Sequence, residues 1–462
     1  MAIVGAIMVP HPPIILPEVG RGEEKKIAAT DAAYRKAAAF AAELEPETIV
    51  LLSPHSVMYA DYFHISPGKS AKGDMRQFRA SSVKFEVAYD TEFVHELMTT
   101  ASGDDFPAGT LGERDPELDH GTMIPLYYVD QYDTNYKLVR IGLSGLPLTD
   151  HYRLGQRIRA AADALGRRVV VIGSGDLSHK LKKDGPYGLS KEGPEYDERI
   201  MDVMGRAAFD ELLDFDETFC DRAAECGHRS FCIMAGALDG LTVETEKLSH
   251  EETFGVGYGV CTYRVIGEDP SRHCLEIWRE RQKKELDAKR QGEDAYVRLA
   301  RATVESWVRE RKRPELPDDL PEEMLKDRAG VFVSLHKDGR LRGCIGTIQA
   351  TKKNIAEEIV ENGISASTRD PRFSAVRPDE LDALEISVDV LGDAEKISSK
   401  DELDVKRYGV IVTKGFRRGL LLPNLDGVDT VDQQVQIALQ KAGLSKQEKN
   451  FEMERFEVVR HV

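Results

Sequence analysis

Histidines stand directly after apolar segments of this chain. His11 lies just beyond the apolar run 3–9, and His55 lies just beyond the run 48–52. His179 comes shortly after a third run of valine and isoleucine. Imidazoles bind transition metals and exchange protons near neutral pH. Because the loops at the carboxyl ends of strands in an open α/β sheet converge on one crevice, we expect these histidines to lie together in a metal or acid–base site.

Two further residues complete the candidate constellation, His120 in the segment DHGTMIPL and Glu225 in the segment ECGH. Two neutral imidazoles and one carboxylate form the facial triad that holds non-haem Fe(II) and leaves positions open for substrate and oxygen. Glu225 has an alternative role, because a carboxylate is also favoured at the start of the helix expected near Ser230. His228 is then the rival third ligand.

The segments PHPP, SPH, DHGTMIPL, SGDLSH and ECGH occur in this order within about residues 1–266. This ordered set resembles the LigB-type class III extradiol dioxygenases and the related Memo family. The resemblance implies a reaction that opens a small catechol-like or otherwise bidentate substrate. It also implies that Fe(II), or alternatively Zn²⁺, is bound by the three residues His11, His55 and Glu225. His179 matches the acid–base residue, and His120 matches a residue that contacts substrate or oxygen.

A second group of motifs lies in the carboxyl-terminal part, LRGCIGTI around Cys344 and DPRFSAV around Arg372. These motifs resemble the AMMECR family over residues 292–462. Cys344 is a candidate nucleophile, since the nearby Arg342 would favour its thiolate. The alternative is a buried turn in which the cysteine is a small apolar residue. Arg372 is a candidate to bind a carboxylate or phosphate, and a structural salt bridge is the alternative.

The fusion of a LigB/Memo-like domain with an AMMECR-like domain resembles the AmmeMemoRadiSam architecture, which implies a radical-SAM enzyme as a partner. The chain itself has no CxxxCxxC spacing that would hold an iron–sulfur cluster. Two alternatives to a dioxygenase therefore stay open. One is a metal-dependent step that works with the radical-SAM partner and does not use oxygen. The other is a Memo-like binding or scaffold protein without enzymatic activity.

The elements that must position these residues follow from periodicity. Up to residue 266, short β-branched runs alternate with alanine-rich helical stretches such as 24–43, which favours an α/β domain with a central sheet flanked by helices. A polar helical linker is expected over 267–291. Residues 292–462 mix helices with strands such as 384–391, which predicts an α+β domain. A length of 462 residues agrees with two domains.

Composition narrows the class of partner. The net charge of −17 argues against binding to nucleic acid, which needs clustered lysine and arginine. Neither a secretory leader nor an apolar segment of the roughly 20 residues needed to span a bilayer is found, so we expect a cytoplasmic protein with no membrane partner. The six cysteines show no CxxC spacing. LigB-type proteins often associate, so the resemblance leaves a homo-oligomer open.

Overall fold

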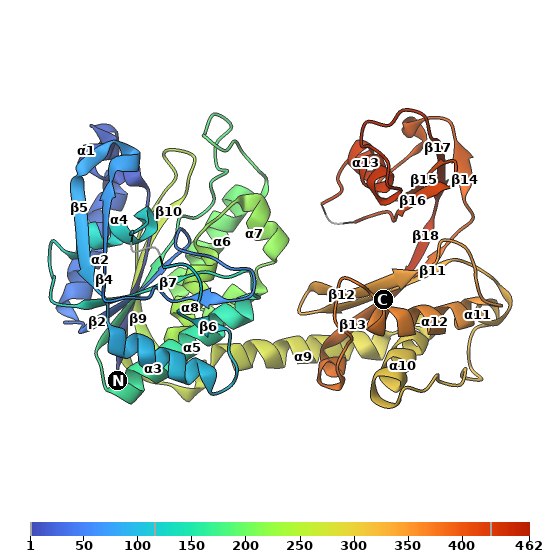
Figure 1. The fold of residues 1–462 in the computed structure, drawn as a ribbon, viewed down its shortest axis with the longest axis horizontal. Helices are drawn as coiled ribbons and strands as arrows, with labels where there is room; N and C mark the ends of the chain where they lie inside the picture. The colour runs from blue at the N-terminus through green and yellow to red at the C-terminus, as the bar shows by residue number, and fades with distance from the viewer. Residues whose placement is uncertain (1, 115–116, 426) are drawn as a thin grey trace. The chain divides into compact units, whose positions relative to one another are not determined.

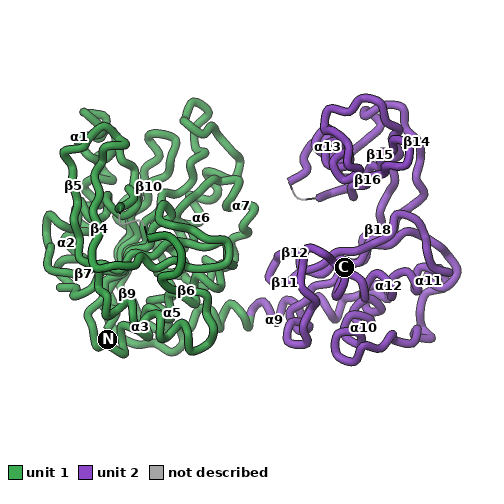
Figure 2. The backbone as a smooth tube through the Cα atoms, in the orientation of Figure 1, with its two compact units in different colours: residues 1–280 green, residues 281–462 purple. Residues whose placement is uncertain are grey.

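The computed structural model describes residues 2–114, 117–425 and 427–462 (Figure 1). The chain forms two compact units, residues 1–280 and 281–462 (Figure 2). The boundary falls inside helix α9 (Cys274–Gly292), which occupies most of the segment expected to be a helical linker. No helix among the described residues is long and apolar enough to cross a membrane.

A six-stranded mixed sheet forms the centre of the first unit, in the order β7-β2-β8-β1-β10-β9. Neighbours among β7, β2, β8 and β1 are parallel, whereas β10 runs antiparallel to both β1 and β9. In this order the strands are Lys137–Gly142, Thr48–Ser53, Val169–Ser174, Ile3–Val9, Tyr258–Glu268 and Leu241–Glu251. The four parallel strands are almost wholly buried, as expected for a sheet covered on both faces.

Helices cover both faces of this sheet (Figure 1). Alternate residues of β2 point to opposite layers: Ile49 and Leu51 join the core beneath α2 and α4, and Val50 and Leu52 join the core beneath α5 and α8. The principal helices are α2 (Ala28–Glu43), α3 (Thr91–Ser102), α4 (His120–Val129), α5 (Leu148–Leu165), α6 (Glu192–Arg206) and α8 (His228–Ala237). The predicted α/β domain is therefore confirmed.

Shorter elements complete the first unit. The hairpin β4–β5 and the pair β3–β6 form two small separate sheets, and β3 and β5 contact β7 at the edge of the central sheet. These elements are α1 (Pro17–Gly20), β3 (Phe63–His64), β4 (Ser70–Met75), β5 (Ala80–Ala88), β6 (Ala108–Gly109) and α7 (Glu217–Ala223).

The second unit contains two antiparallel four-stranded sheets, so the predicted α+β class is also confirmed. The first sheet, β12-β11-β13-β18, packs against α10 and α12, and the second, β14-β17-β15-β16, packs against α13. The helices are α10 (Ala295–Glu310), α11 (Glu322–Lys326), α12 (Ile355–Thr368) and α13 (Val431–Lys441). The strands are β11 (Val331–Lys337), β12 (Arg340–Gly346), β13 (Leu384–Leu391), β14 (Glu395–Ile397), β15 (Gly409–Lys414), β16 (Arg417–Leu421), β17 (Glu452–Phe456) and β18 (Val458–His461).

Candidate metal centre

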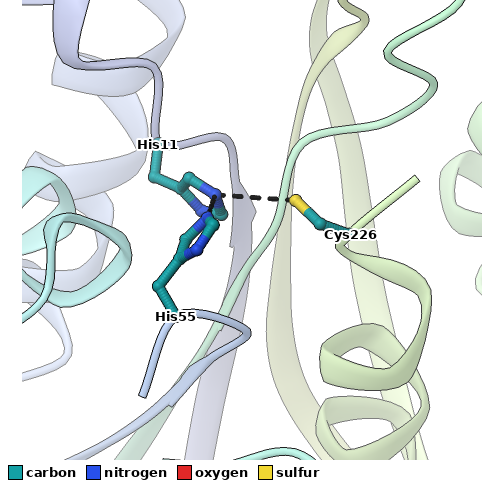
Figure 3. Close-up of side chains that lie close together, drawn as sticks. All are labelled: His11, His55 and Cys226. Carbon is teal, nitrogen blue, oxygen red and sulfur yellow. Dashed lines mark hydrogen bonds between the residues drawn. The ribbon is translucent and has the colours of Figure 1, made fainter. Parts of the chain in front are cut away.

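The carboxyl ends of β1 and β2, which β8 separates in the sheet, and the segment just before α8 bring two imidazoles and a thiol together (Figure 3). His11 follows β1 and His55 follows β2, and their Nε2 atoms are 3.0 Å apart. The Sγ atom of Cys226, which lies just before α8, is 3.6 Å from Nε2 of His11. One ligand atom from each of these three residues lies within 4.8 Å of the other two.

The environment of His11 determines which of its nitrogens faces this cluster. The Ser174 hydroxyl donates a hydrogen bond to the Gly121 carbonyl at 2.6 Å and lies 2.9 Å from Nδ1 of His11. A serine hydroxyl has a single proton, so Ser174 must accept from Nδ1–H of His11. The Nε2 lone pair of His11 is then directed at the cluster. This arrangement is typical of metal-ligating histidines, whose second nitrogen is held by a hydrogen bond.

Burial keeps these imidazoles in the neutral form that binds metals. The pKa of His11 is lowered by desolvation. Desolvation, with the neighbouring His11 and His120, lowers the pKa of His55 to about 3. The pKa of His120 falls to about 4, again chiefly through desolvation. Two nitrogens that are each about 2.0–2.1 Å from one ion lie about 3 Å apart when the angle between them is near 90°. The observed separation therefore suits a shared metal.

His120 begins α4 and stacks beside the pair. Its ring centroid is 4.0 Å from that of His55 and 5.4 Å from that of His11. The helix start is held by Asp119, whose carboxylate accepts from the backbone N–H of Thr122 and from the Ser53 hydroxyl. His120 is thus close to the cluster without being one of its three converging donors, a position compatible with the expected contact to substrate or oxygen.

The structure gives Glu225 and His228 other partners. Glu225 accepts a hydrogen bond from the backbone N–H of His228 at 2.6 Å, and so caps α8, which begins at His228 and not at Ser230. Burial raises the pKa of Glu225 to about 7. Both ring nitrogens of His228 face other groups, the Tyr196 hydroxyl at 3.3 Å and the Leu212 carbonyl at 2.9 Å. Glu225 as a metal ligand stays a prediction.

Sequence reasoning did not propose Cys226 as a metal ligand, although it is adjacent to Glu225. The Sγ atom of Cys226 accepts a hydrogen bond from the backbone N–H of Asp176 at 3.3 Å, which directs the sulfur toward the histidines. Burial and the negative charges of Asp176 and Glu225 raise the pKa of this thiol. A bound metal cation would instead favour the thiolate, because coordinating thiols lose their proton. The signal in the sequence that could have identified Cys226 was its position next to the candidate ligand Glu225.

His179 lies farther along the loop after β8, beside the cluster. Its Nε2 atom is 3.9 Å from the carboxylate of Asp176, and its ring packs against Tyr187 with centroids 5.2 Å apart. Asp176 also accepts the backbone N–H of His11 at 2.8 Å. One carboxylate therefore connects the proposed acid–base residue to the loop that carries a candidate ligand.

A cavity of about 1230 Å³ opens next to this centre. His55 and His120 line one end, and the hairpin β4–β5 contributes much of the remaining wall. Cations and carboxylates both line it, including Lys72, Arg76, Asp119 and Arg140. The cavity has both polar and apolar walls, and its opening lets a ligand reach the two histidines from solvent.

In the second unit, Cys344 and Arg372 lie together. Cys344 is partly exposed on β12, and its carbonyl accepts from Nη2 of Arg372 at 3.0 Å. Arg372 also pairs with Asp370 at 2.7 Å, the salt bridge that the sequence left as the alternative. The sequence predicts Arg342 beside the thiol, but the guanidinium of Arg342 donates two hydrogen bonds of 3.0 Å to the Glu380 carboxylate. The cation beside Cys344 is therefore Arg372.

Residues 5–261 match the family described as the catalytic LigB subunit of aromatic ring-opening dioxygenase. This match spans more than half of the chain, so the chain belongs to that family. Residues 297–461 match the family AMMECR1, which forms the carboxyl-terminal domain. Proteins of the LigB family are typically metal-dependent, and the cluster of His11, His55 and Cys226 offers a metal site in this chain.

A protein of Clostridium acetobutylicum is 41% identical over 470 residues, covering 100% of this chain and 99% of its own length. A protein of Thermotoga maritima is 52% identical over 171 residues, covering 37% of this chain and 98% of its own. The crystal structure of an uncharacterised protein from Pyrococcus horikoshii aligns with 30% identity and a TM-score of 0.34, over 36% of this chain and 88% of its own. The family assignment rests on the sequence matches alone.

Proposed function

We propose that the first unit is a metal-dependent oxidoreductase of the ring-opening type, in which Fe(II) held by His11, His55 and Cys226 serves a small catechol-like or otherwise bidentate substrate. The observation that carries this proposal is the convergence of two imidazole nitrogens, 3.0 Å apart, which follow the parallel strands β1 and β2, with one thiol that lies just before α8. The adjoining cavity supplies the route for the substrate.

The donor set supports a first-row transition metal. Imidazole suits iron and zinc, and thiolate binds both, whereas Mg²⁺ and Ca²⁺ prefer oxygen donors. Fe(II) is the metal that the family resemblance implies, and Zn²⁺ is the alternative that uses the same donors. When bound, the metal would lower the pKa of a substrate hydroxyl and, if it is iron, exchange electrons with oxygen.

The chain supplies the groups that handle protons and position the substrate. His120 is neutral, because desolvation lowers its pKa to about 4, and it lines the cavity together with the candidate ligand His55. It is therefore placed to orient or accept a proton from a substrate hydroxyl. His179 has Asp176 beside it and provides a second imidazole for proton transfer. The cavity exceeds the 300–1,000 Å³ usual for small-molecule pockets, so a catechol bearing a larger substituent fits.

Metal analysis of anaerobically purified protein tests the site. We expect about one iron per chain in the wild type and a loss of it in His55→Ala. The matched control is His95→Ala, since His95 is an exposed histidine on α3, away from the cluster. Zinc in place of iron would contradict the redox assignment and favour a non-oxidative step. Absence of any metal in the wild type would overturn the proposal.

Substitutions at the adjacent positions 225 and 226 identify the third ligand of the metal. Cys226→Ser should lower metal affinity strongly, because a hydroxyl is a much poorer ligand than a thiolate. Glu225→Gln should retain stoichiometric metal, since that carboxylate caps α8. The opposite result would assign the facial triad of His11, His55 and Glu225 instead.

Turnover separates the reaction types. Oxygen uptake with a panel of catechols, lost in His179→Ala with metal content retained, would support ring opening. Turnover only without oxygen, and only with a radical-SAM partner, would replace that reaction with a coupled metal-dependent step. A function that persists in His11→Ala without metal would favour a scaffold protein.

A further inference from the structure

The second unit contains a reactive-residue cluster that the proposed oxidoreductase does not use. Cys344 on β12 stands directly opposite Ser334 on β11, and the Ser334 hydroxyl donates to Sγ of Cys344 at 3.2 Å. The thiol is partly exposed. Four of the other cysteines are buried, namely Cys220, Cys232, Cys261 and Cys274. Cys344 is thus a partly exposed cysteine whose thiol is oriented by the Ser334 hydroxyl.

Arg372 is fixed beside this thiol. The buried carboxylate of Asp370 accepts from Nε of Arg372 at 2.9 Å and from Nη2 at 2.7 Å, and it also accepts the backbone N–H of Cys344 at 2.9 Å. The Arg372 side chain is nevertheless 53% exposed. Among the described residues, no group accepts from its Nη1. Nε and Nη2 of the guanidinium are therefore engaged by Asp370 and by the Cys344 carbonyl, and Nη1 is left to bind a ligand.

Lys441, the last residue of α13, brings a second cation to the same place. It interacts electrostatically with the Cys344 thiol and with Arg372. Desolvation, together with the charge of Arg372, lowers the pKa of Lys441 although the residue lies at the surface. No carboxylate within the described part of the chain forms an ion pair with it.

This surplus of positive charge is notable in a chain with 80 acidic and 63 basic residues. Two cations near each other repel. Among the described residues, the carboxylate paired with Arg372 is that of Asp370, which forms no ion pair with Lys441. An anion that bound between Lys441 and Nη1 of Arg372 would relieve the repulsion and would lie beside the thiol.

We propose that Cys344, Arg372 and Lys441 form an anion-binding thiol site, which holds the carboxylate or phosphate group of a small molecule against the Cys344 sulfur. Nη1 of Arg372 can donate a charge-assisted hydrogen bond to such a group, and lysine adds a point charge. The site lies wholly within the second unit and does not depend on the metal centre.

Charge-selective alkylation of the full chain tests this proposal. Iodoacetate and iodoacetamide react with the same thiol, forming an S–C bond and releasing iodide, but only iodoacetate is an anion. The rate at Cys344 is measured for each reagent by peptide mass spectrometry at constant ionic strength. Lys441→Gln should lower the ratio of the iodoacetate rate to the iodoacetamide rate by about two- to fivefold, the effect of one unit charge at short range in water. Lys446→Gln, which removes an exposed lysine from the loop after α13, should leave the ratio unchanged.

Protection experiments identify the anion. Added phosphate or acetate should slow alkylation of wild-type Cys344 by the uncharged iodoacetamide, and should do so less in Lys441→Gln. Stronger protection by phosphate assigns a phosphorylated ligand, and stronger protection by acetate assigns a carboxylate. The proposal is overturned if neither anion protects relative to chloride, if the two lysine variants show the same ratio as the wild type, or if Cys344 does not react in the native protein.

Discussion

Ser174 should control metal binding through the tautomer of His11. The Ser174→Ala variant removes the acceptor that holds Nδ1–H of His11, while both residues lie in the buried interior with relative exposures of 0% and 1%. Without that acceptor the proton is free to move to Nε2, the nitrogen that faces Cys226 and His55. The imidazole would then present a donor instead of a lone pair to the metal.

The magnitude follows from the loss of one hydrogen bond to a ligand. Removing an outer partner of a metal-ligating histidine costs about 10- to 100-fold in metal affinity, or about 1.4 to 2.8 kcal/mol. The same change leaves the Nδ1–H group and the Gly121 carbonyl without their partner, so the free energy of unfolding should also fall by about 1–3 kcal/mol.

The assay is competition for metal against a chelator of known affinity, with the imidazole tautomer followed by ¹⁵N NMR. Ser230→Ala is a matched control, because Ser230 is equally buried and its hydroxyl has no hydrogen-bond partner among the described residues. It should leave metal affinity unchanged. Equal metal affinity in Ser174→Ala and the wild type would refute the argument from tautomer control.

Two further predictions concern stability. Gly155→Ala should lower the free energy of unfolding by about 1–3 kcal/mol in denaturant titrations, because a Cβ at this position would collide with the backbone of α8. The control Gly205→Ala has room beside Lys247 and should be neutral or stabilising, so equal effects of the two substitutions would contradict the close packing of α5 on α8. The Arg372 side chain holds the pKa of Asp370 below its usual range, so the unfolded chain takes up a proton first as the pH falls. The stability contributed by Asp370 is therefore fully present above about pH 4 and is lost below it. Asp370→Asn should melt at a lower temperature than the wild type at neutral pH, with a difference that shrinks in acid; a difference independent of pH would exclude this origin.

The architecture was largely predictable because it depends on short-range patterns. Continuous apolar runs such as 169–172 indicate strands buried on both faces, and the alternation of such runs with helical stretches indicates an α/β domain. The strand expected at 384–391 is β13, Leu384–Leu391. The start of α8, expected near Ser230, falls at His228, where the Glu225 carboxylate reaches a free N–H group.

The candidate site was predictable only in part. A histidine that directly follows a strand must lie at the edge of the sheet, so the proximity of His11 and His55 could be expected. The third donor could not, because Glu225 and Cys226 are adjacent and the sequence does not show which of them points inward. The carboxylate of Glu225 is turned to the start of α8, while the thiol of Cys226 is held by the backbone of Asp176.

By itself, the sequence determined the class of each domain, the family and the loops that carry the reactive residues, since these depend on local periodicity and on ordered motifs. The tertiary structure decided which side chains contact one another. The Ser174 hydroxyl that sets the His11 tautomer is 163 residues away from it in the chain, and Lys441 at the end of α13 interacts electrostatically with Cys344 on β12. These contacts depend on the course of the backbone and on side-chain orientations, which only the folded chain defines. Hydrogen bonds and close charge interactions act over a few ångströms, whatever the separation of the residues in sequence.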